Sequence, residues 1–408
     1  MRCLLIAIVL MFPIPGGAEN RTLHIYQDAD LSNHIESSES IQKGIELAFD
    51  EIDNEIEGFK IEFRYLDHRG NVIRSKRNYQ KFINDPKAIA IYSGIHSPPL
   101  IKNREFINSE KALTLVPWAA GGPITRYPSS INWVYRLSVD DTQAGAVIID
   151  FAVNRRGCES PHLLLEDTPW GDSNFKSMSD ALYRNDVKKI SVTRFGWNLK
   201  KKGAREILRN IANQGNDCVV LVANSVEGKV IVREMVNYPV ERRLPIISHW
   251  GITGGDFPEV ITASDREDLE LHFIQTCFAF TSAHQSDFSK KVFYRLKKYT
   301  SGDIDHPNKL NSATGFIHAY DLTKILIQAI RQTGLTGDMN IDRNAIRLAL
   351  ENIREPVEGL VKNYHSPFSV FSENTNYNAH EALNADDYCI GRFGPDNEVI
   401  LLQGKSDE

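Results

Sequence analysis

Three of the five tryptophans stand in short loops that directly follow predicted strands, each with glycine close by. Trp118 lies in loop 117–122, Trp170 in loop 167–172 and Trp250 in loop 249–256. An indole ring offers a large apolar contact surface at a small cost in conformational entropy, which suits the wall of a binding cleft. The chemistry predicted from these rings is noncovalent capture of a small molecule. Packing between two domains is the alternative interpretation for any one of them.

Loop 93–98 combines Gly94 with Ser97 at the point where a helix is predicted to begin. Glycine lets the backbone approach a ligand closely, and free amides at a helix N-terminus can meet a carboxylate. An ordinary serine N-cap is the alternative. Ala119 and Ala120, beside Trp118, are small enough to expose backbone donors and acceptors. We therefore expect both loops to contribute to the same kind of binding site.

Residue patterns for covalent catalysis are absent. The sequence has no GxSxG elbow, P-loop or HExxH motif, and no dinucleotide-binding glycine motif after its first strand. The twelve histidines are dispersed without paired metal-ligand spacing, so a zinc site would need assembly from distant parts of the chain. We expect no catalytic residue, metal or cofactor. His249, next to Trp250, is a candidate hydrogen-bond partner for a ligand.

The chain supplies a scaffold for these loops by alternating apolar strands with amphipathic helices. In the first part, strands are predicted at 23–26, 61–66, 88–92 and 113–116, and helices at 41–52, 76–83 and 99–109. After 140–141 the alternation restarts, with strands at 162–165, 190–194, 218–222, 245–248 and 273–280 and helices at 144–154, 174–184, 204–214 and 229–237. Helices at 314–333 and 342–352 and a hairpin at 388–402 follow. This alternation predicts an α/β fold with two doubly wound parallel sheets.

In open parallel sheets, ligands bind beyond the carboxyl ends of the strands. Topology alone therefore selects six loops for the site: 27–40, 93–98, 117–122, 167–172, 223–228 and 249–256. The three tryptophan loops and the Ser97 loop are among them, which strengthens the expectation of a binding cleft.

Residues 1–18 have the layout of a cleavable signal peptide. Arg2 precedes the apolar run 4–12, and Pro13 and Pro15 then end it before Glu19. A buried N-terminal strand is the alternative. No later stretch approaches the ~18 apolar residues of a membrane span, so we expect an exported protein, periplasmic or extracellular.

Charge and cysteines narrow the possibilities further. The net charge is −6 without a basic stripe, which argues against nucleic acid as a partner. Removal of the signal would leave Cys158, Cys218, Cys277 and Cys389, an even number that permits one or two disulfides in an oxidising compartment. Cys158 and Cys218 each precede an apolar strand and could face each other at one sheet edge. Small buried thiols are the alternative.

Several segments together carry a family likeness: 44–48 (GIELA), 93–99, 117–120 (PWAA), Arg136 to Asp141 with 143–145 (QAG), and 319–321 (AYD). By their order and spacing the chain resembles the type I periplasmic solute-binding proteins of the leucine/isoleucine/valine-binding class, which serve ABC importers. The resemblance implies two lobes joined by a multi-strand hinge, a monomer, a small-molecule ligand and a transporter permease as partner. Lobe one would comprise 19–140 with about 275–360, and lobe two 141–274 with about 361–408.

The resemblance also assigns roles to residues. Ser97, with Ala119 and Ala120, would hold a ligand carboxylate, and Trp170 would lie across the ligand. Ser37, in the loop after the first strand, would add a polar contact.

By the resemblance, the position where the family places an acidic partner for an α-ammonium is Trp250 or a residue directly beside it. Because a buried ammonium without a carboxylate is costly, this departure favours an aromatic or otherwise apolar carboxylate over a free amino acid. Asp256 or Glu227 could restore the charge. The expected mechanism is hinged capture, with lobe two closing over a ligand bound on lobe one.

Three other functions stay open at this point. A ligand-sensing subunit would keep the same fold. An enzyme would use Asp167, Asp172, Asp256 and His249 as acid–base groups. An adhesive surface protein would show no stabilisation by a ligand.

Overall fold

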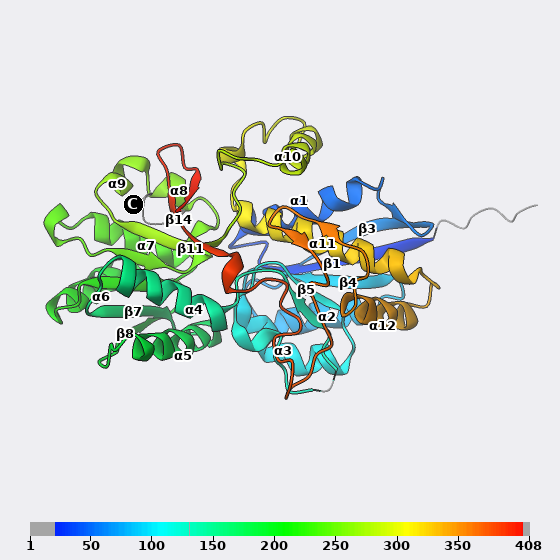
Figure 1. Cartoon of the computed structure of the whole chain (residues 1–408), viewed down its shortest axis with the longest axis horizontal. Coiled ribbons are helices and arrows are strands. Elements are labelled where there is room, and N and C mark those ends of the chain that lie inside the picture. Colours follow the sequence, from blue (N-terminus) through cyan, green and yellow to red (C-terminus); the bar gives the residue numbers. More distant parts are fainter. Residues whose placement is uncertain (1–20, 130, 403–408) are drawn as a thin grey trace, which may run out of the picture.

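The computed structural model describes residues 21–129 and 131–402, which form two α/β lobes lying side by side (Figure 1). The predicted signal peptide at 1–18 lies outside the described residues. Within the described part, no helix is long and apolar enough to cross a membrane.

The sheet of lobe one has, among the described residues, six strands in the order β2-β3-β1-β4-β5-β6. They are β1 (Thr22–Ala29), β2 (Glu55–Ile56), β3 (Phe59–Asp67), β4 (Ala88–Ser93), β5 (Thr114–Val116) and β6 (Val134–Arg136). All neighbours pair in parallel except β2 with β3. The packed helices are α1 (Ile35–Asp50), α2 (Val72–Asn84), α3 (Ser97–Ser109), α11 (Ala313–Thr333) and α12 (Met339–Leu350). Burial on both faces explains why β4 is an uninterrupted apolar run ending in serine.

Helices α1 and α11 approach each other closely because Gly44 lies between them. A Cβ at this position would come within 2.4 Å of the Phe316 carbonyl oxygen, so only glycine permits the contact. The glycine of the GIELA segment therefore serves helix packing.

The sheet of lobe two has, in the described chain, seven strands in the order β15-β14-β11-β10-β9-β7-β8. They are β7 (Pro161–Glu166), β8 (Ser191–Phe195), β9 (Cys218–Val222), β10 (Ile246–Ser248), β11 (Leu271–Thr276), β14 (Tyr388–Phe393) and β15 (Val399–Leu401). The helices are α4 (Asp141–Asp150), α5 (Pro169–Arg184), α6 (Lys201–Asn213), α7 (Ser225–Val236), α8 (Phe257–Val260) and α9 (Ala263–Glu267). β7 to β11 pair in parallel, whereas β14 and β15 form the predicted antiparallel hairpin at the edge. The expected α/β fold with two doubly wound sheets is confirmed.

Some local predictions are wrong. The strand expected at 273–280 ends at Thr276, where the chain leaves the sheet toward lobe one. Trp170 is not in a loop: it lies in the first turn of α5, which begins at Pro169 with Thr168 as its N-cap. The patterns also missed β6 and the helix α10 (Asp287–Tyr299).

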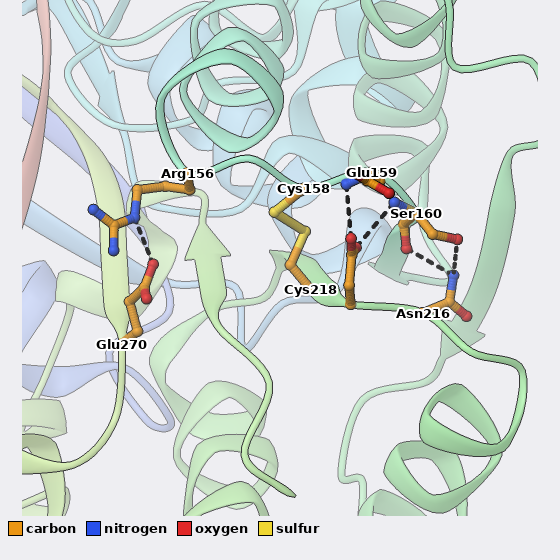
Figure 2. Close-up of a disulfide and its surroundings, with 8 residues drawn as sticks. Arg156, Cys158, Glu159, Ser160, Asn216, Cys218 and Glu270 are labelled. Carbon is orange, nitrogen blue, oxygen red and sulfur yellow. Dashed lines mark hydrogen bonds and ion pairs between the residues drawn. A yellow bond between two sulfur atoms is a disulfide. The ribbon is translucent and has the colours of Figure 1, made fainter. Parts of the chain in front are cut away.

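Two disulfides are formed among the described cysteines. Cys158 bonds Cys218 at the amino ends of the neighbouring strands β7 and β9 (Figure 2). The Asp217 carboxylate holds the same corner by accepting hydrogen bonds from the amides of Glu159 and Ser160. Cys277 bonds Cys389 across β11 and β14. The sequence left open whether Cys158 and Cys218 pair or stay as buried thiols, and the structure shows the disulfide.

The chain passes between the lobes, within its described part, through segments 137–140, 277–286 and 384–387. A buried ion cluster lies at the first crossing. Arg136 donates to Asp140 and Glu381 at 2.7 Å each, and Arg126 donates to Asp140 at 2.6 Å. The Asp140 amide also donates to the Tyr388 hydroxyl, at the start of β14, at 2.9 Å. The first and third crossings are therefore fixed to each other.

The chain after α12 returns to lobe one before it enters lobe two. β12 (Val357–Glu358) pairs with β13 (Asn363–Tyr364), and His380 then stacks on Tyr135 of β6 with ring centroids 3.9 Å apart. The lobe boundaries expected from the sequence assign all residues from about 361 onward to lobe two. These contacts place the first part of that segment beside β6, and of its described residues only those of β14 and β15 join the second sheet.

Candidate ligand site between the lobes

Trp118 and Trp250 meet between the lobes. Trp118 follows β5 and Trp250 follows β10, and their ring centroids lie 5.5 Å apart with both side chains buried. Gly315 of α11 makes room for Trp118, since a Cβ there would come within 3.1 Å of the ring. The Trp250 ring also lies 5.1 Å from the His318 ring of the same helix. The two tryptophans therefore fill the interface with side-chain packing.

Trp170 and His249 lie beside this pair, around the buried Asp141 of α4. The Trp170 Nε1 donates to Asp141 Oδ1 at 3.3 Å, and the His249 Nε2 lies 3.0 Å from the same oxygen. Among the described residues, Asp141 Oδ2 and His249 Nδ1 are buried without a hydrogen-bond partner. We call Trp118, Trp170, His249 and Trp250 the tryptophan interface.

The groups expected to hold a carboxylate are buried and engaged with the protein itself. Ser97 Oγ accepts from the Gly121 amide at 3.0 Å. The carbonyl of Ala119 accepts from Arg136 at 3.2 Å, and that of Ala120 accepts from the Asp141 amide at 3.0 Å.

Ser37 takes part in an inter-lobe contact rather than facing a cavity. Its Oγ lies 2.9 Å from Ser312 Oγ, and the Gly255 amide of lobe two donates to both hydroxyl oxygens. Asp256, the predicted alternative acid, is paired with Lys229.

An open cavity of about 310 Å³ lies elsewhere along the same interface. Both lobes line it, through Asp30, Asn33, His34, Arg69 and His96 from lobe one and Trp197, Asn198, Asn224, Val226 and Glu227 from lobe two. We call it the histidine cavity. Every lining residue follows a strand at its carboxyl end, which is where parallel sheets place ligands. Of the residues singled out from the sequence, Glu227 lies here.

The adjacency of strands brings the lobe-one residues together. β1 lies between β3 and β4, so the loops that follow these three strands meet at one edge of the sheet. Gly94 allows the β4 loop to lie directly on the end of β1, because a Cβ there would come within 2.7 Å of the Ala29 Cα. As a result, His34 and His96 have ring centroids 4.8 Å apart, and His68 lies 5.9 Å from His96.

Buried titratable groups surround the cavity. Burial lowers the pKa of His34 and of His68 to about 3, and the proximity of His96 adds to the effect, so both rings are neutral at pH 7. Burial would raise the pKa of Asp30, but hydrogen bonds from His96 and Asn33 outweigh it and bring the pKa below its usual range. Asp30 is therefore ionised.

The acids of lobe two behave differently. Burial raises the pKa of Glu227, whose Oε1 accepts from the Asn198 amide at 2.8 Å. Burial also raises the pKa of Glu166, below the cavity, to about 7. Glu166 accepts from the Trp197 indole at 2.9 Å and from the Asn224 amide at 3.1 Å. These two acids thus position the residues that line the cavity.

Sequence reasoning missed most of this cavity. Asp30, Asn33, His34 and His96 fall in selected loops but were not singled out. Arg69, Trp197 and Asn198 follow β3 and β8, whose loops were not selected. A usable signal was present: one histidine follows each of β1, β3 and β4. The three are far apart in sequence, so only the strand order reveals that they meet.

Comparison with known proteins agrees with this architecture. A family model described as periplasmic binding protein matches residues 32–374. A search of curated proteins finds no match. A possible leucine/isoleucine/valine-binding protein from Rhodopirellula baltica SH 1 is similar in structure, with a TM-score of 0.76 at 16% identity, covering 97% of this chain and 100% of that one.

Two further solved structures are similar. One is a periplasmic binding protein type 1 from Bordetella pertussis Tohama I, with a TM-score of 0.75 at 16% identity, covering 93% of this chain and 99% of that one. The other is an ABC-transporter solute-binding protein from R. palustris in complex with 4-hydroxybenzoate, with a TM-score of 0.75 at 15% identity, covering 94% and 96%. At such identities the structures support the fold, which is that of a type I periplasmic binding protein, and the family match is decisive: the chain belongs to the periplasmic binding protein family.

Proposed function

We propose that this chain is an extracytoplasmic solute-binding protein that captures a small carboxylate in the histidine cavity and delivers it to an ABC importer. The observation that carries the proposal is the cavity itself: about 310 Å³ at the carboxyl ends of strands, with walls from both lobes. A ligand held there contacts lobe one and lobe two together. It therefore favours the closed form, as a hinged-capture mechanism requires.

The lining favours a carboxylate with an apolar or aromatic body. Arg69 and the side-chain amide of Asn198 offer donors, while Trp197 and Val226 offer apolar contact. The acidic side chains of the lining compete only weakly with an anionic ligand for these donors. Glu227 has a raised pKa, and Asp30 already accepts from Asn33. Solved relatives in complex with benzoate and 4-hydroxybenzoate make these compounds reasonable first probes.

Export is part of the same proposal. The predicted signal peptide at 1–18, the two disulfides and the family match support a location outside the cytoplasm, since disulfides persist in oxidising compartments. We propose that the mature chain acts as a monomer with a permease as its partner.

The tryptophan interface is the second candidate site. The unpartnered Asp141 Oδ2 and His249 Nδ1 favour it, because buried polar atoms of this kind usually have partners. In an opened form, a ligand ring would insert between Trp118 and Trp250. Ser37, Ser97, Ala119, Ala120 and Trp170 would then surround it, as the sequence predicts.

Calorimetric titration distinguishes the two sites. Benzoate, 4-hydroxybenzoate and leucine are titrated into the mature protein and into Arg69→Gln and Trp197→Ala. We expect a carboxylate to bind with 1:1 stoichiometry, and each variant to weaken it by about tenfold or more, equivalent to about 1.4 kcal/mol. Asn210→Ala, at an exposed position of α6, is the matched control and should bind normally.

Binding that is unchanged in both cavity variants but lost in Trp118→Ala would move the site to the tryptophan interface. Recovery of the unaltered ligand after long incubation is expected, and turnover would overturn the binding role. A sensor of the same fold would share the binding result, so uptake that depends on a co-expressed permease separates delivery from sensing.

A further inference from the structure

The wall of the histidine cavity contains a set of side chains that a solute-binding role does not explain. Asp30, His34 and His96 each place a potential ligand atom so that all three atoms lie within 4.8 Å of one another. All three residues are more than nine-tenths buried, yet all three line the cavity.

The spacing of these atoms suits one small cation. With bonds of 2.0–2.1 Å, two ligands of a tetrahedral zinc ion lie about 3.3 Å apart. The Asp30 Oδ2 and the His96 Nε2 are separated by 3.2 Å. Closing the remaining distance to His34 requires a shift of about 1.5 Å at most, which side-chain rotation can supply.

The ring nitrogens are available for coordination. Among the residues that the structure describes, the His34 ring contacts His96 edge-on and has no hydrogen-bond partner. The His96 Nε2 contacts Asp30 Oδ2, which is itself one of the three proposed ligand atoms. Within the described chain, neither nitrogen would have to give up a protein partner outside this group of three residues to bind a cation.

The surroundings orient the carboxylate. Asp30 Oδ1 accepts from the amides of Ser32 and Asn33 at 3.3 and 3.0 Å, and these bonds fix the Asp30 side chain with Oδ2 toward His96. Hydrogen bonds of this kind hold ligating carboxylates in metal sites. Trp197 covers the other side of His96, with ring centroids 5.1 Å apart, and limits access of bulk water.

We propose that Asp30, His34 and His96 bind a divalent first-row transition metal of the Zn²⁺ class on the lobe-one wall of the histidine cavity. Two imidazoles and one carboxylate form a donor set that such ions prefer over Ca²⁺ or Mg²⁺, which select oxygen ligands. Three protein ligands leave coordination positions open, and these face the cavity. Water or a donor atom of a bound solute completes the shell. The site goes beyond the proposed function and does not require it.

Metal titration tests this assignment directly. Mature protein without a polyhistidine tag is stripped with EDTA, dialysed and titrated with ZnCl₂ by calorimetry. We expect saturable 1:1 binding, which His34→Gln and His96→Gln each weaken by at least about tenfold and which the double variant abolishes. His34→Gln is the safest variant for folding, because its ring makes no hydrogen bond that the fold would lose. MgCl₂ should give no saturable binding.

Co²⁺ supplies an independent readout. The visible absorption of bound Co²⁺ should show bands of a four- or five-coordinate ion in the native protein and lose them in His96→Gln. His284→Gln, at an exposed position of lobe one's crossover, is the control and should leave both signals unchanged. Circular dichroism melts confirm that each variant is folded. An absence of saturable Zn²⁺ binding, or binding that survives in the folded double variant, would overturn the site.

Discussion

The tryptophan interface and the histidine cavity lie at the same boundary between the lobes, but their side chains do opposite things there. In the first, Trp118 and Trp250 bury each other and occupy the space with their own rings. In the second, mostly polar residues leave about 310 Å³ open, and the Trp197 side chain among them is still 38% exposed. Both regions follow the carboxyl ends of strands. Position in the fold therefore selects where a cleft forms, and side-chain size and polarity decide whether it stays open.

The largest effect that this contrast predicts is on stability. Trp250→Ala should lower the free energy of unfolding by about 3–5 kcal/mol, since the lost ring leaves a void between Trp118 and His318. Trp197→Ala should cost far less, because its ring is partly exposed. Urea denaturation of both variants measures the difference. Equal losses would mean that the two regions do not differ in packing.

A smaller effect should appear as a pH dependence on the cavity side. Burial raises the pKa of Glu166 from 4.5 to about 7, so the folded protein holds the proton of this carboxyl more tightly than the unfolded chain does. The stabilisation that results is complete below about pH 4.5 and is lost as the pH rises through 7. Between pH 4.5 and 8 the native protein should lose stability relative to Glu166→Gln, on the order of 3 kcal/mol. Thermal or urea unfolding over this range gives the slope, which is independent of any constant cost of the substitution.

Asp167, the exposed residue next to Glu166, supplies a control for the slope of stability against pH. Asp167→Asn, one residue further along, should retain the pH dependence of the native protein. A slope that is the same in Glu166→Gln and in the native protein would show that folding does not raise the pKa of the Glu166 carboxyl.

The smallest effect concerns the polar contact that flanks the tryptophans. Ser312→Ala removes the hydroxyl that accepts from the Gly255 amide at 2.7 Å, while Ser37 can still accept at 3.2 Å. We expect a loss of about 0.5–1.5 kcal/mol in the free energy of unfolding. Ser301→Ala, outside the interface, should leave stability within error. A loss as large as that of Trp250→Ala would show that polar contacts, not ring packing, hold the lobes together.

The sequence predicts the architecture well because burial imposes its own pattern. β4 and β9 are buried on both faces and read as apolar runs. The pattern of α11 gives the start of its helix to within one residue, whereas α1 begins at Ile35, six residues before the predicted start. Trp170 was misplaced because Pro169 was interpreted as a loop residue, although proline suits the first turn of a helix.

The site is less predictable because it depends on sheet order. Ser97 and Ser37 have the residue types of ligand-binding groups, but the structure gives their hydroxyls internal partners that no local pattern reveals. His34, His68 and His96 carry little signal individually. They become a cluster only when β1 is known to lie between β3 and β4.

The cross-links between the crossing segments have a consequence for how far the lobes can move. The buried cluster of Arg136, Asp140 and Glu381, with the Asp140 amide on Tyr388, joins the first crossing to the third, and the disulfide Cys277–Cys389 joins the second to the third. Three segments tied in this way cannot slide or splay independently, so the relative motion that remains is rotation about a single axis. Thiol reductants would remove one tie and admit additional orientations of the lobes. The redox state of the compartment thereby limits how many relative orientations the two lobes can adopt.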